Sequence, residues 1–302
     1  MHYRWHYGLM GTRTGELKDI LEQNYHIKTY FSPLSNRSRS CQIVFDLEET
    51  HPQFEEIVNA IAQDTWDDSD YPAEGNGVRV YIPVYSEEEY LSSKWLTVRS
   101  SFSKVYVTNE DQLCHKACIF GKDKFGHLRG RHVFEAGGCV VKSPVKWGRT
   151  RFASSMTNES RLFCDDAARS ILEQHQISGI EFLQVIKKST KQPMDDIHQL
   201  INTFTVPNGG IVGLDYTTDY VCSECGMNML CWSDQRFKFG IRSGSIPEGL
   251  DFCRTLPLFL GSEPDKTYGA HALTLISQKM YRTLKDNMLD RSLWFEPVDI
   301  IE

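Results

Sequence analysis

The chain has 302 residues and a formal net charge of −7, from 33 basic and 40 acidic side chains. Hydrophobic residues make up 40% of the sequence and charged residues 24%, which is ordinary for a globular protein with a substantial core. Because proteins that bind nucleic acids usually carry a basic field, this acidic balance argues against a nucleic acid and favours a basic protein as partner.

The sequence has no segment with the character of a membrane span or a secretory signal. Its longest purely apolar runs, such as residues 139–141 and 258–260, are far too short to cross a bilayer, and no apolar core follows residues 1–5. The nine cysteines are an odd number and are scattered along the chain, a pattern typical of reduced thiols. A soluble protein of the cytoplasm is therefore expected.

Periodicity and turn residues predict the elements of the N-terminal third. Strands are expected at residues 41–46, 78–84 and 102–107, and helices at 15–23, 51–64 and 86–92, with residues 1–40 otherwise irregular. Residues 65–77 are acidic and rich in turn formers, so they are expected to form a loop. This loop is either a solvated connector or a recognition loop for a basic partner, with Asp67, Asp68 and Asp70 as candidate contacts.

Cysteines and basic residues mark the next stretch. A helix over residues 109–120 would place Cys114 and Cys118 on one face. Residues 121–138 are rich in glycine and in basic side chains, but they lack the order of strand, Gly-Lys and helix that a phosphate-binding loop has. Their basic members include Lys122, Lys124, Arg129 and Arg131. A strand over residues 139–145 follows, and then a polar linker over 150–159, which divides the chain into domains 1–150 and 151–302.

A helix followed by a strand occurs twice in the second half, in residues 162–185 and 275–298. The matched positions are Asp165 and Ser277 as N-caps, Leu172 and Leu284 in the helices, and Phe182 and Phe295 in the strands. Between the copies we expect a helix over 195–203, a strand over 211–216 and a short hairpin around 230–241. The predicted fold class is α+β: mixed sheets with helices packed on one face, a repeated helix–strand unit, and a zinc-knuckle-like insertion.

Cys222 and Cys225 carry the clearest chemical signal. They lie two residues apart and are followed by Gly226, which allows the tight turn of a knuckle that aims both sulfurs at one tetrahedral Zn²⁺. A structural zinc needs two further ligands, for which Cys114 with Cys118, Cys231, His198 and Cys253 are the candidates. Two alternatives remain: a redox dithiol, which would open a helix after a strand, and a metal-free turn held by packing.

Three blocks of the C-terminal half resemble the double-CxxCG motif proteins. They are CSECG at residues 222–226, SIPEGLDF at 245–252, and the unit 275–298 that ends in WFEPV. Those proteins are regarded as immunity proteins paired with the polymorphic toxins of myxobacteria and related bacteria. The resemblance covers residues 162–300 and implies binding and sequestering of a toxin. The first CxxCG of that family is missing here, although Cys114 and Cys118 could supply its sulfurs.

The sequence favours a binding protein over an enzyme. It contains no G-x-S-x-G, H-E-x-x-H, P-loop or G-x-G-x-x-G pattern. We therefore expect a non-enzymatic cytoplasmic protein that sequesters a cognate bacterial toxin, with a structural zinc. Two other classes stay open. One is an enzyme, a hydrolase or a nucleotide-modifying enzyme, that uses the basic residues 121–138, and the other is a zinc-ribbon adaptor.

Overall fold

The computed structural model describes residues 2–9, 13–33, 41–48, 50–57, 78–108, 119–122, 128–130, 138–155, 161–207, 209–212, 216–221, 228–232, 240–255, 258–260 and 272–302. The chain divides into two compact units, unit 1 at Met1–Glu87 and unit 2 at Glu88–Glu302. The predicted domain boundary near residue 150 lies inside unit 2, because strands from both sides of it pair in the same sheets. Mixed sheets with few helices make the protein α+β, as predicted.

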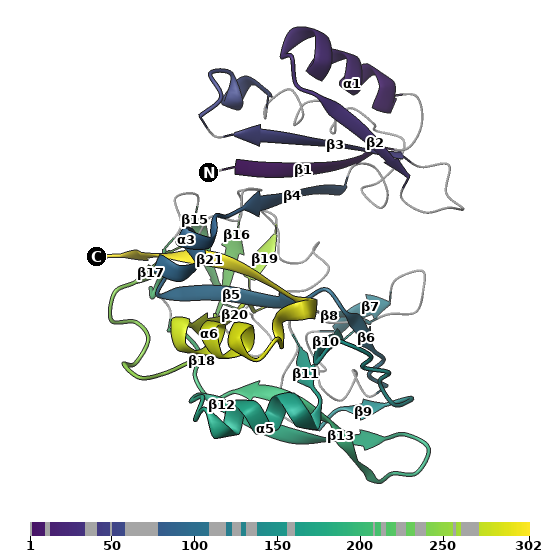
Figure 1. The fold of residues 1–302 in the computed structure, drawn as a ribbon, viewed down its shortest axis with the longest axis vertical. Helices are drawn as coiled ribbons and strands as arrows, with labels where there is room; N and C mark the ends of the chain where they lie inside the picture. Colours follow the sequence, from purple (N-terminus) through teal and green to yellow (C-terminus); the bar gives the residue numbers. More distant parts are fainter. Residues whose placement is uncertain are drawn as a thin grey trace. The chain divides into compact units, whose positions relative to one another are not determined.

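Unit 1 is built on a sheet in which every neighbouring pair of strands is antiparallel (Figure 1). Its strand order is β2 (Thr29–Pro33), β3 (Cys41–Glu48), β1 (His2–Leu9) and β4 (Val78–Val84), accompanied by helix α1 (Arg13–Asn24). The predicted strands at 41–46 and 78–84 and the helix at 15–23 are confirmed. The irregular chain expected over residues 1–40 is wrong, since β1 lies between β3 and β4.

The described part of unit 2 contains two six-stranded sheets. The first sheet has the order β6 (Ser103–Val105), β10 (Phe152–Ser155), β11 (Leu162–Cys164), β13 (Pro193–Asn202), β12 (Ile180–Lys187) and β9 (Val140–Val141). The second sheet has the order β14 (Ile211–Val212), β17 (Gly240–Arg242), β21 (Leu293–Ile301), β5 (Trp95–Ser100), β20 (Thr274–Ser277) and β18 (Phe252–Arg254).

The two sheets repeat one arrangement. In the first repeat, β11, helix α5 (Asp166–Gln174) and β12 enclose the antiparallel strand β13. In the second repeat, β20, helix α6 (Gln278–Asp286) and β21 enclose the antiparallel strand β5. The flanking strands also match: β10 and β18 are antiparallel to β11 and β20, whereas β9 and β17 are parallel to β12 and β21. The enclosed strand β13 follows β12 in the chain, but β5 comes from far upstream.

Local details of the helices agree with the repeat. Asp165 and Ser277 are the N-caps, and their side chains accept hydrogen bonds from the backbone N–H groups of Ala168 and Met280. Each helix is followed by a residue with positive φ: Gln176 at 51° and Met288 at 55°. The predicted helix–strand duplication with these caps is therefore confirmed. A short helix, α3 (Glu87–Ser92), also forms where one was predicted.

The helices of the two repeats share a central core. Leu172 of α5 and Leu284 of α6 are buried there with Phe152 and Phe252, which start β10 and β18. A second cluster covers the far face of the first sheet and a third covers the far face of the second, with Val185 and Val298 at matched positions. Both sheets are thus buried on two faces over much of their area.

Burial on two faces explains two wrong predictions. Residues 195–203 were expected to be helical, but Pro193–Asn202 is strand β13, with Ile197 in the far-face cluster and Leu200 in the central core. A strand buried on both faces has apolar residues without alternation, and such a run imitates helical spacing. The linker expected at residues 150–159 instead contains β10, which is buried throughout.

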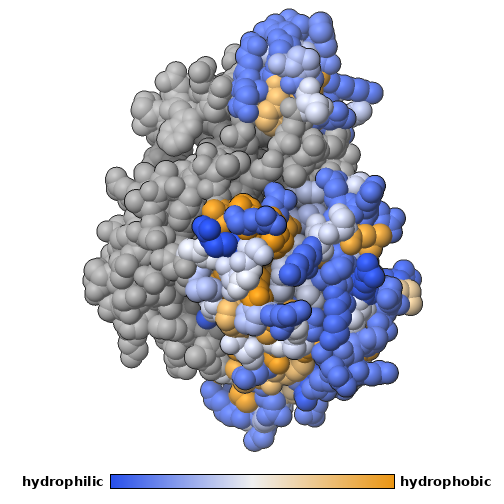
Figure 2. Space-filling view, turned by 90° about the vertical axis from the view of Figure 1, so that its left-hand side faces the viewer, coloured by the Kyte–Doolittle hydropathy of each residue, from blue (hydrophilic) through white to orange (hydrophobic). Residues whose placement is uncertain are grey.

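Among the described residues, no helix is long and apolar enough to cross a membrane. Hydrophobic residues reach one face of the protein in small groups between hydrophilic ones, as Figure 2 shows. The exposed large hydrophobic side chains of the described part of unit 2 are Leu91, Tyr106, Met288, Trp294, Ile300 and Ile301.

Candidate functional site

The residues predicted to bind zinc or a partner lie outside the described residues. This applies to Cys114, Cys118, Cys222, Cys225, Asp67, Asp68 and Asp70. Within the basic stretch 121–138 the structure describes residues 121–122 at the end of β7 (Ile119–Lys122), β8 (Leu128–Gly130), which pairs antiparallel with β7, and Gly138. The zinc site, the acidic contact loop and a role for this basic stretch remain predictions.

Paired strands flank the CxxC segment. β15 (Tyr216–Val221) and β16 (Asn228–Trp232) are antiparallel, and their last pair is Val221 opposite Asn228. Cys222 and Cys225 therefore belong to the connection between two paired strand ends. β16 also pairs in parallel with β19 (Leu258–Leu260). The short strand β14 and β15 stand in place of the single strand predicted at residues 211–216.

Three of the other proposed zinc ligands lie on described strands of three different sheets: Cys231 on β16, Cys253 on β18 and His198 on β13. Cys253 is buried in the cluster behind the second sheet, and burial raises the pKa of its thiol to about 12. His198 is in the first sheet and faces α5. Within the described ranges no group of three or more His, Cys, Asp or Glu side chains is arranged to hold a metal ion.

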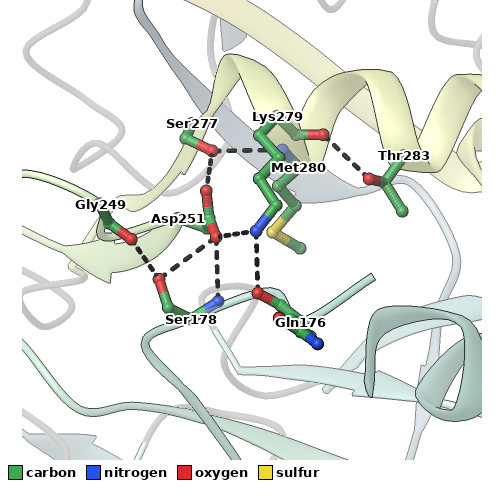
Figure 3. A network of polar contacts seen from close by, with 8 residues as sticks. All are labelled: Gln176, Ser178, Gly249, Asp251, Ser277, Lys279, Met280 and Thr283. Atoms are coloured by element: carbon green, nitrogen blue, oxygen red, sulfur yellow. Dashed lines mark hydrogen bonds and ion pairs between the residues drawn. The ribbon is translucent and has the colours of Figure 1, made fainter. Parts of the chain in front are cut away.

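A buried aspartate joins the two repeats (Figure 3). Asp251, in the chain just before β18, is 4% exposed. Its carboxylate accepts hydrogen bonds from Ser178 N at 3.0 Å and Ser277 Oγ at 2.7 Å, and pairs with Lys279 Nζ at 3.1 Å. Burial raises the pKa of Asp251, but these hydrogen bonds from Ser178, Ser277 and Lys279 outweigh it and hold the pKa below its ordinary value.

The same contact holds the turn after α5 against the second repeat. Lys279 Nζ also donates to Gln176 O at 2.9 Å, and Ser178 Oγ donates to Gly249 O at 2.6 Å. At Gly179, with φ of +87°, a Cβ would lie 2.2 Å from the carbonyl oxygen of Phe252. This position therefore requires glycine, both for its backbone conformation and for the close approach of the two repeats.

A corresponding contact holds the N-cap of α5 in the first repeat. Asp165 N donates to Arg151 O at 3.1 Å, and Arg151 Nη1 pairs with Asp165 Oδ2 at 2.6 Å. Ser277 N likewise donates to Asp251 O at 2.8 Å, with the Ser277 side chain bound to Asp251. In each repeat, the residue just before the phenylalanine that starts β10 or β18 contacts the N-cap of the helix: Arg151 contacts Asp165, and Asp251 contacts Ser277.

A polar cluster lies on the outer side of α5 in the first repeat. His198 Nε2 lies 3.3 Å from Asp166 Oδ1, and His198 Nδ1 lies 3.5 Å from Arg169 Nη1. Because a guanidinium can only donate, Nδ1 must accept, which places the ring hydrogen on Nε2, facing Asp166. Arg169 also lies over the ring of Phe182, 5.6 Å from its centre, and pairs with Glu173 at 2.8 Å. We call Asp166, Arg169, Glu173 and Phe182 the α5 surface.

A cysteine, a histidine and an aspartate lie near this cluster, as in a nucleophilic site, but the histidine is not placed to act as a base for the thiol. Cys164 lies opposite His198 in the β11–β13 pair, and Asp166 contacts the imidazole of His198. Burial, assisted by the charge of Asp165, raises the pKa of the Cys164 thiol well above its ordinary value. Both ring nitrogens of His198 are engaged by Asp166 and Arg169, so neither serves as a base for the thiol.

An exposed aromatic platform lies on the second sheet. Trp294 of β21 is 43% exposed and lies opposite Arg99 of β5, whose guanidinium carbon is 5.0 Å from the indole ring. Arg99 Nη2 also pairs with Glu296 at 3.0 Å. Further along the same sheet face, Trp95 and Val298 are buried. We call Trp294, Arg99 and Glu296 the tryptophan platform. The alternation in residues 293–298 hints at an outward Trp294, but its partner Arg99 depends on pairing that the sequence does not show.

Comparison of the chain with protein-family models, with curated proteins and with solved structures gave no match. The function therefore has to be argued from these sites.

Proposed function

We propose that this chain is a non-enzymatic, immunity-type protein that binds and sequesters a bacterial protein toxin in the cytoplasm. The observation that supports it is the tryptophan platform, an exposed indole stacked with an arginine near one end of the pairing between β21 and β5. Tryptophan and arginine are the residue types that most often dominate the energy of protein–protein interfaces. The proposal also takes up the predicted resemblance to toxin-immunity proteins.

The platform is suited to binding because it is ordered before a partner arrives. Trp294 and Arg99 are fixed by strand pairing, and the ion pair with Glu296 holds the guanidinium against the indole. Less side-chain entropy is then lost on association. The net charge of −7 favours a basic toxin, and long-range attraction would speed its capture. Asp67, Asp68 and Asp70 remain the proposed acidic contacts, and the Cys222–Cys225 knuckle a proposed structural zinc site.

The test is formation of a complex with a toxin domain, which is sought among the genes beside the one that encodes this chain. We expect a stable 1:1 complex by size-exclusion chromatography with light scattering, and rescue of cells that express the toxin. Trp294→Ala should raise the Kd by more than about thirty-fold, the loss of an interface hot spot. The matched control is Tyr106→Ala, another exposed aromatic beside a cation, Lys142, which should change the Kd by less than about three-fold.

Two results would count against this proposal. One is a toxin that forms no complex and is not neutralised. The other is multiple turnovers of a small compound by the purified chain, abolished by a substitution in the basic stretch 121–138, which would favour the enzyme instead.

A further inference from the structure

In the second repeat, α3 covers the outer side of the helix and its strand. The Tyr90 ring stacks on Tyr281 at 5.9 Å between ring centres, and Tyr281 meets Phe295 edge-on at 5.0 Å. Gln278 Nε2 donates to the carbonyl oxygens of Tyr90 at 2.6 Å and Ser93 at 2.8 Å. The Tyr90 hydroxyl donates to Phe295 O at 3.4 Å. This segment is thus held on the second repeat by the Tyr90 ring and by two of its backbone carbonyl groups, which accept hydrogen bonds from Gln278.

The α5 surface is the equivalent place in the first repeat. Asp166 corresponds to Gln278 as the first residue of the helix, and Arg169 corresponds to Tyr281 three positions later. Phe182 lies opposite Leu200 of the enclosed strand, as Phe295 lies opposite Val98. The pairing of Arg169 with Phe182 therefore takes the place of the pairing of Tyr281 with Phe295.

This equivalent place is exposed. The side chains of Asp166, Arg169 and Glu173 are 70%, 36% and 49% accessible, and Phe182 is partly exposed. Among the described residues, β9 pairs with β12 only at Ile186 and Lys187, so the first part of β12 is an open edge. A surface that one repeat covers with a helix of the same chain is left available in the other.

We propose that the α5 surface is a docking site for a short helical segment of the protein partner, held as α3 is held on the second repeat. The segment carries an aromatic side chain that stacks on Arg169 and a basic group that meets Asp166 and Glu173. This inference rests on the proposed function for the identity of the partner, but the surface chemistry itself can be tested without that partner.

The differences between the repeats specify the chemistry of the segment. Arg169, a planar cation, replaces Tyr281, and an aromatic ring from the partner would stack on it as Tyr90 stacks on Tyr281. Asp166 replaces Gln278, so a group that donates to carbonyls becomes one that only accepts. The segment must therefore present N–H donors or a Lys or Arg there, where α3 presents carbonyl oxygens.

A second charge difference points the same way. Glu173 occupies the place of Lys285, which lies on the last turn of α6. The α5 surface thus has two carboxylates beside one guanidinium, where the second repeat has a glutamine, a lysine and a tyrosine. His198 contacts both Asp166 and Arg169 and holds them in position before binding. A basic segment with one aromatic residue fits this pattern, whereas an acidic segment or a nucleic acid does not.

The probe is a synthetic helical peptide with one tyrosine and with lysines at the third and fourth positions before it. It is titrated into the ¹⁵N-labelled full chain and followed by amide chemical shifts. We expect saturable shifts centred on residues 166–173 and 180–184. Arg169→Ala should weaken binding about five-fold or more, as the loss of a cation–π contact predicts. The matched control, Arg282→Ala on the exposed side of α6, should change binding by less than about two-fold.

Peptide variants and a conservative variant complete the test. Replacing the tyrosine by alanine, or both lysines by glutamate, should each weaken binding by a similar factor. Arg169→Lys, which keeps the charge and the fold but loses the planar stack, should fall between wild type and Arg169→Ala. Shifts that are scattered, or an affinity equal for Arg169→Ala and wild type, would overturn the inference. A toxin complex unaffected by Arg169→Ala would also remove it while leaving the proposed function standing. A peptide that binds while no toxin does would remove only the proposed function.

Discussion

In the second repeat, α3 lies over Tyr281 and Phe295, whereas the equivalent pair in the first repeat, Arg169 and Phe182, is partly exposed. The buried positions behind these pairs are alike in both repeats: Leu172 matches Leu284 in the same core. The two repeats are alike in the residues that close the core and differ in the residues that face outward. Outward positions that differ in chemistry are therefore where function is to be sought.

The largest expected effect tests whether the two repeats share one central core. Phe152→Ala and Phe252→Ala each delete a fully buried ring at the start of a matched strand, and each should lower the free energy of unfolding by about 3–5 kcal/mol. The two losses should agree within about 1 kcal/mol, because both rings line the same central core. Chemical denaturation, with hydrogen exchange of α5 and α6, provides the measurement. If either substitution lowered the free energy of unfolding by less than about 1 kcal/mol, the two repeats would not share one central core.

A smaller effect should distinguish Asp251 from Arg151, the two residues that hold the helix N-caps Ser277 and Asp165. Asp251 is buried and accepts bonds from Ser178, Ser277 and Lys279, so Asp251→Asn should cost about 2 kcal/mol. Arg151→Gln should cost less than about 1 kcal/mol, because the Arg151 side chain is 41% exposed in its pair with Asp165. Denaturation midpoints of both variants at pH 7 give the comparison. Equal costs would mean that the two caps are energetically equivalent and that the buried link is not special.

The pH dependence of that link has a defined sign. The pKa of Asp251 is lowered from 3.8 in the folded protein, so the unfolded chain binds its proton more readily. The contribution to stability is therefore complete above that ordinary value and is lost as the pH falls through the lower folded pKa. Asp251→Asn should remove this part of the acid dependence, and the difference in stability between wild type and variant should shrink as the pH falls below 3.8. A constant difference over this range would contradict the assignment.

Parts of the fold that depend on contacts between residues close in sequence could be predicted, whereas parts that depend on distant residues could not. The caps Asp165 and Ser277 and the strands that follow their helices depend on neighbours within a few residues, and both copies were predicted correctly. β5 is absent from the predicted elements, and its place between β20 and β21 depends on pairing with strands far along the chain. The doubly buried β13 was mistaken for a helix because its apolar residues do not alternate.

The candidate functional residues follow the same rule. Trp294 and Arg99 are opposite each other only because of strand register, and Arg169 and His198 meet only because α5 packs on β13. Neither pair has a motif that a single sequence reveals. The CxxC segment has such a motif, but its metal depends on ligands from elsewhere in the chain, which local spacing cannot identify. The zinc ion, the toxin and the acidic contacts at Asp67, Asp68 and Asp70 thus stay predictions.

The smallest effect sharpens the comparison between the covered and the open surface. Tyr90→Ala removes the ring that covers Tyr281, and it should lower the free energy of unfolding by about 1–2 kcal/mol. Arg169→Ala on the α5 surface should change it by no more than about 0.5 kcal/mol, since an exposed side chain there contributes little to folding. Both values come from the same denaturation series. If Arg169→Ala were as costly as Tyr90→Ala, Arg169 would be held for stability, and the first repeat would need no partner to complete it.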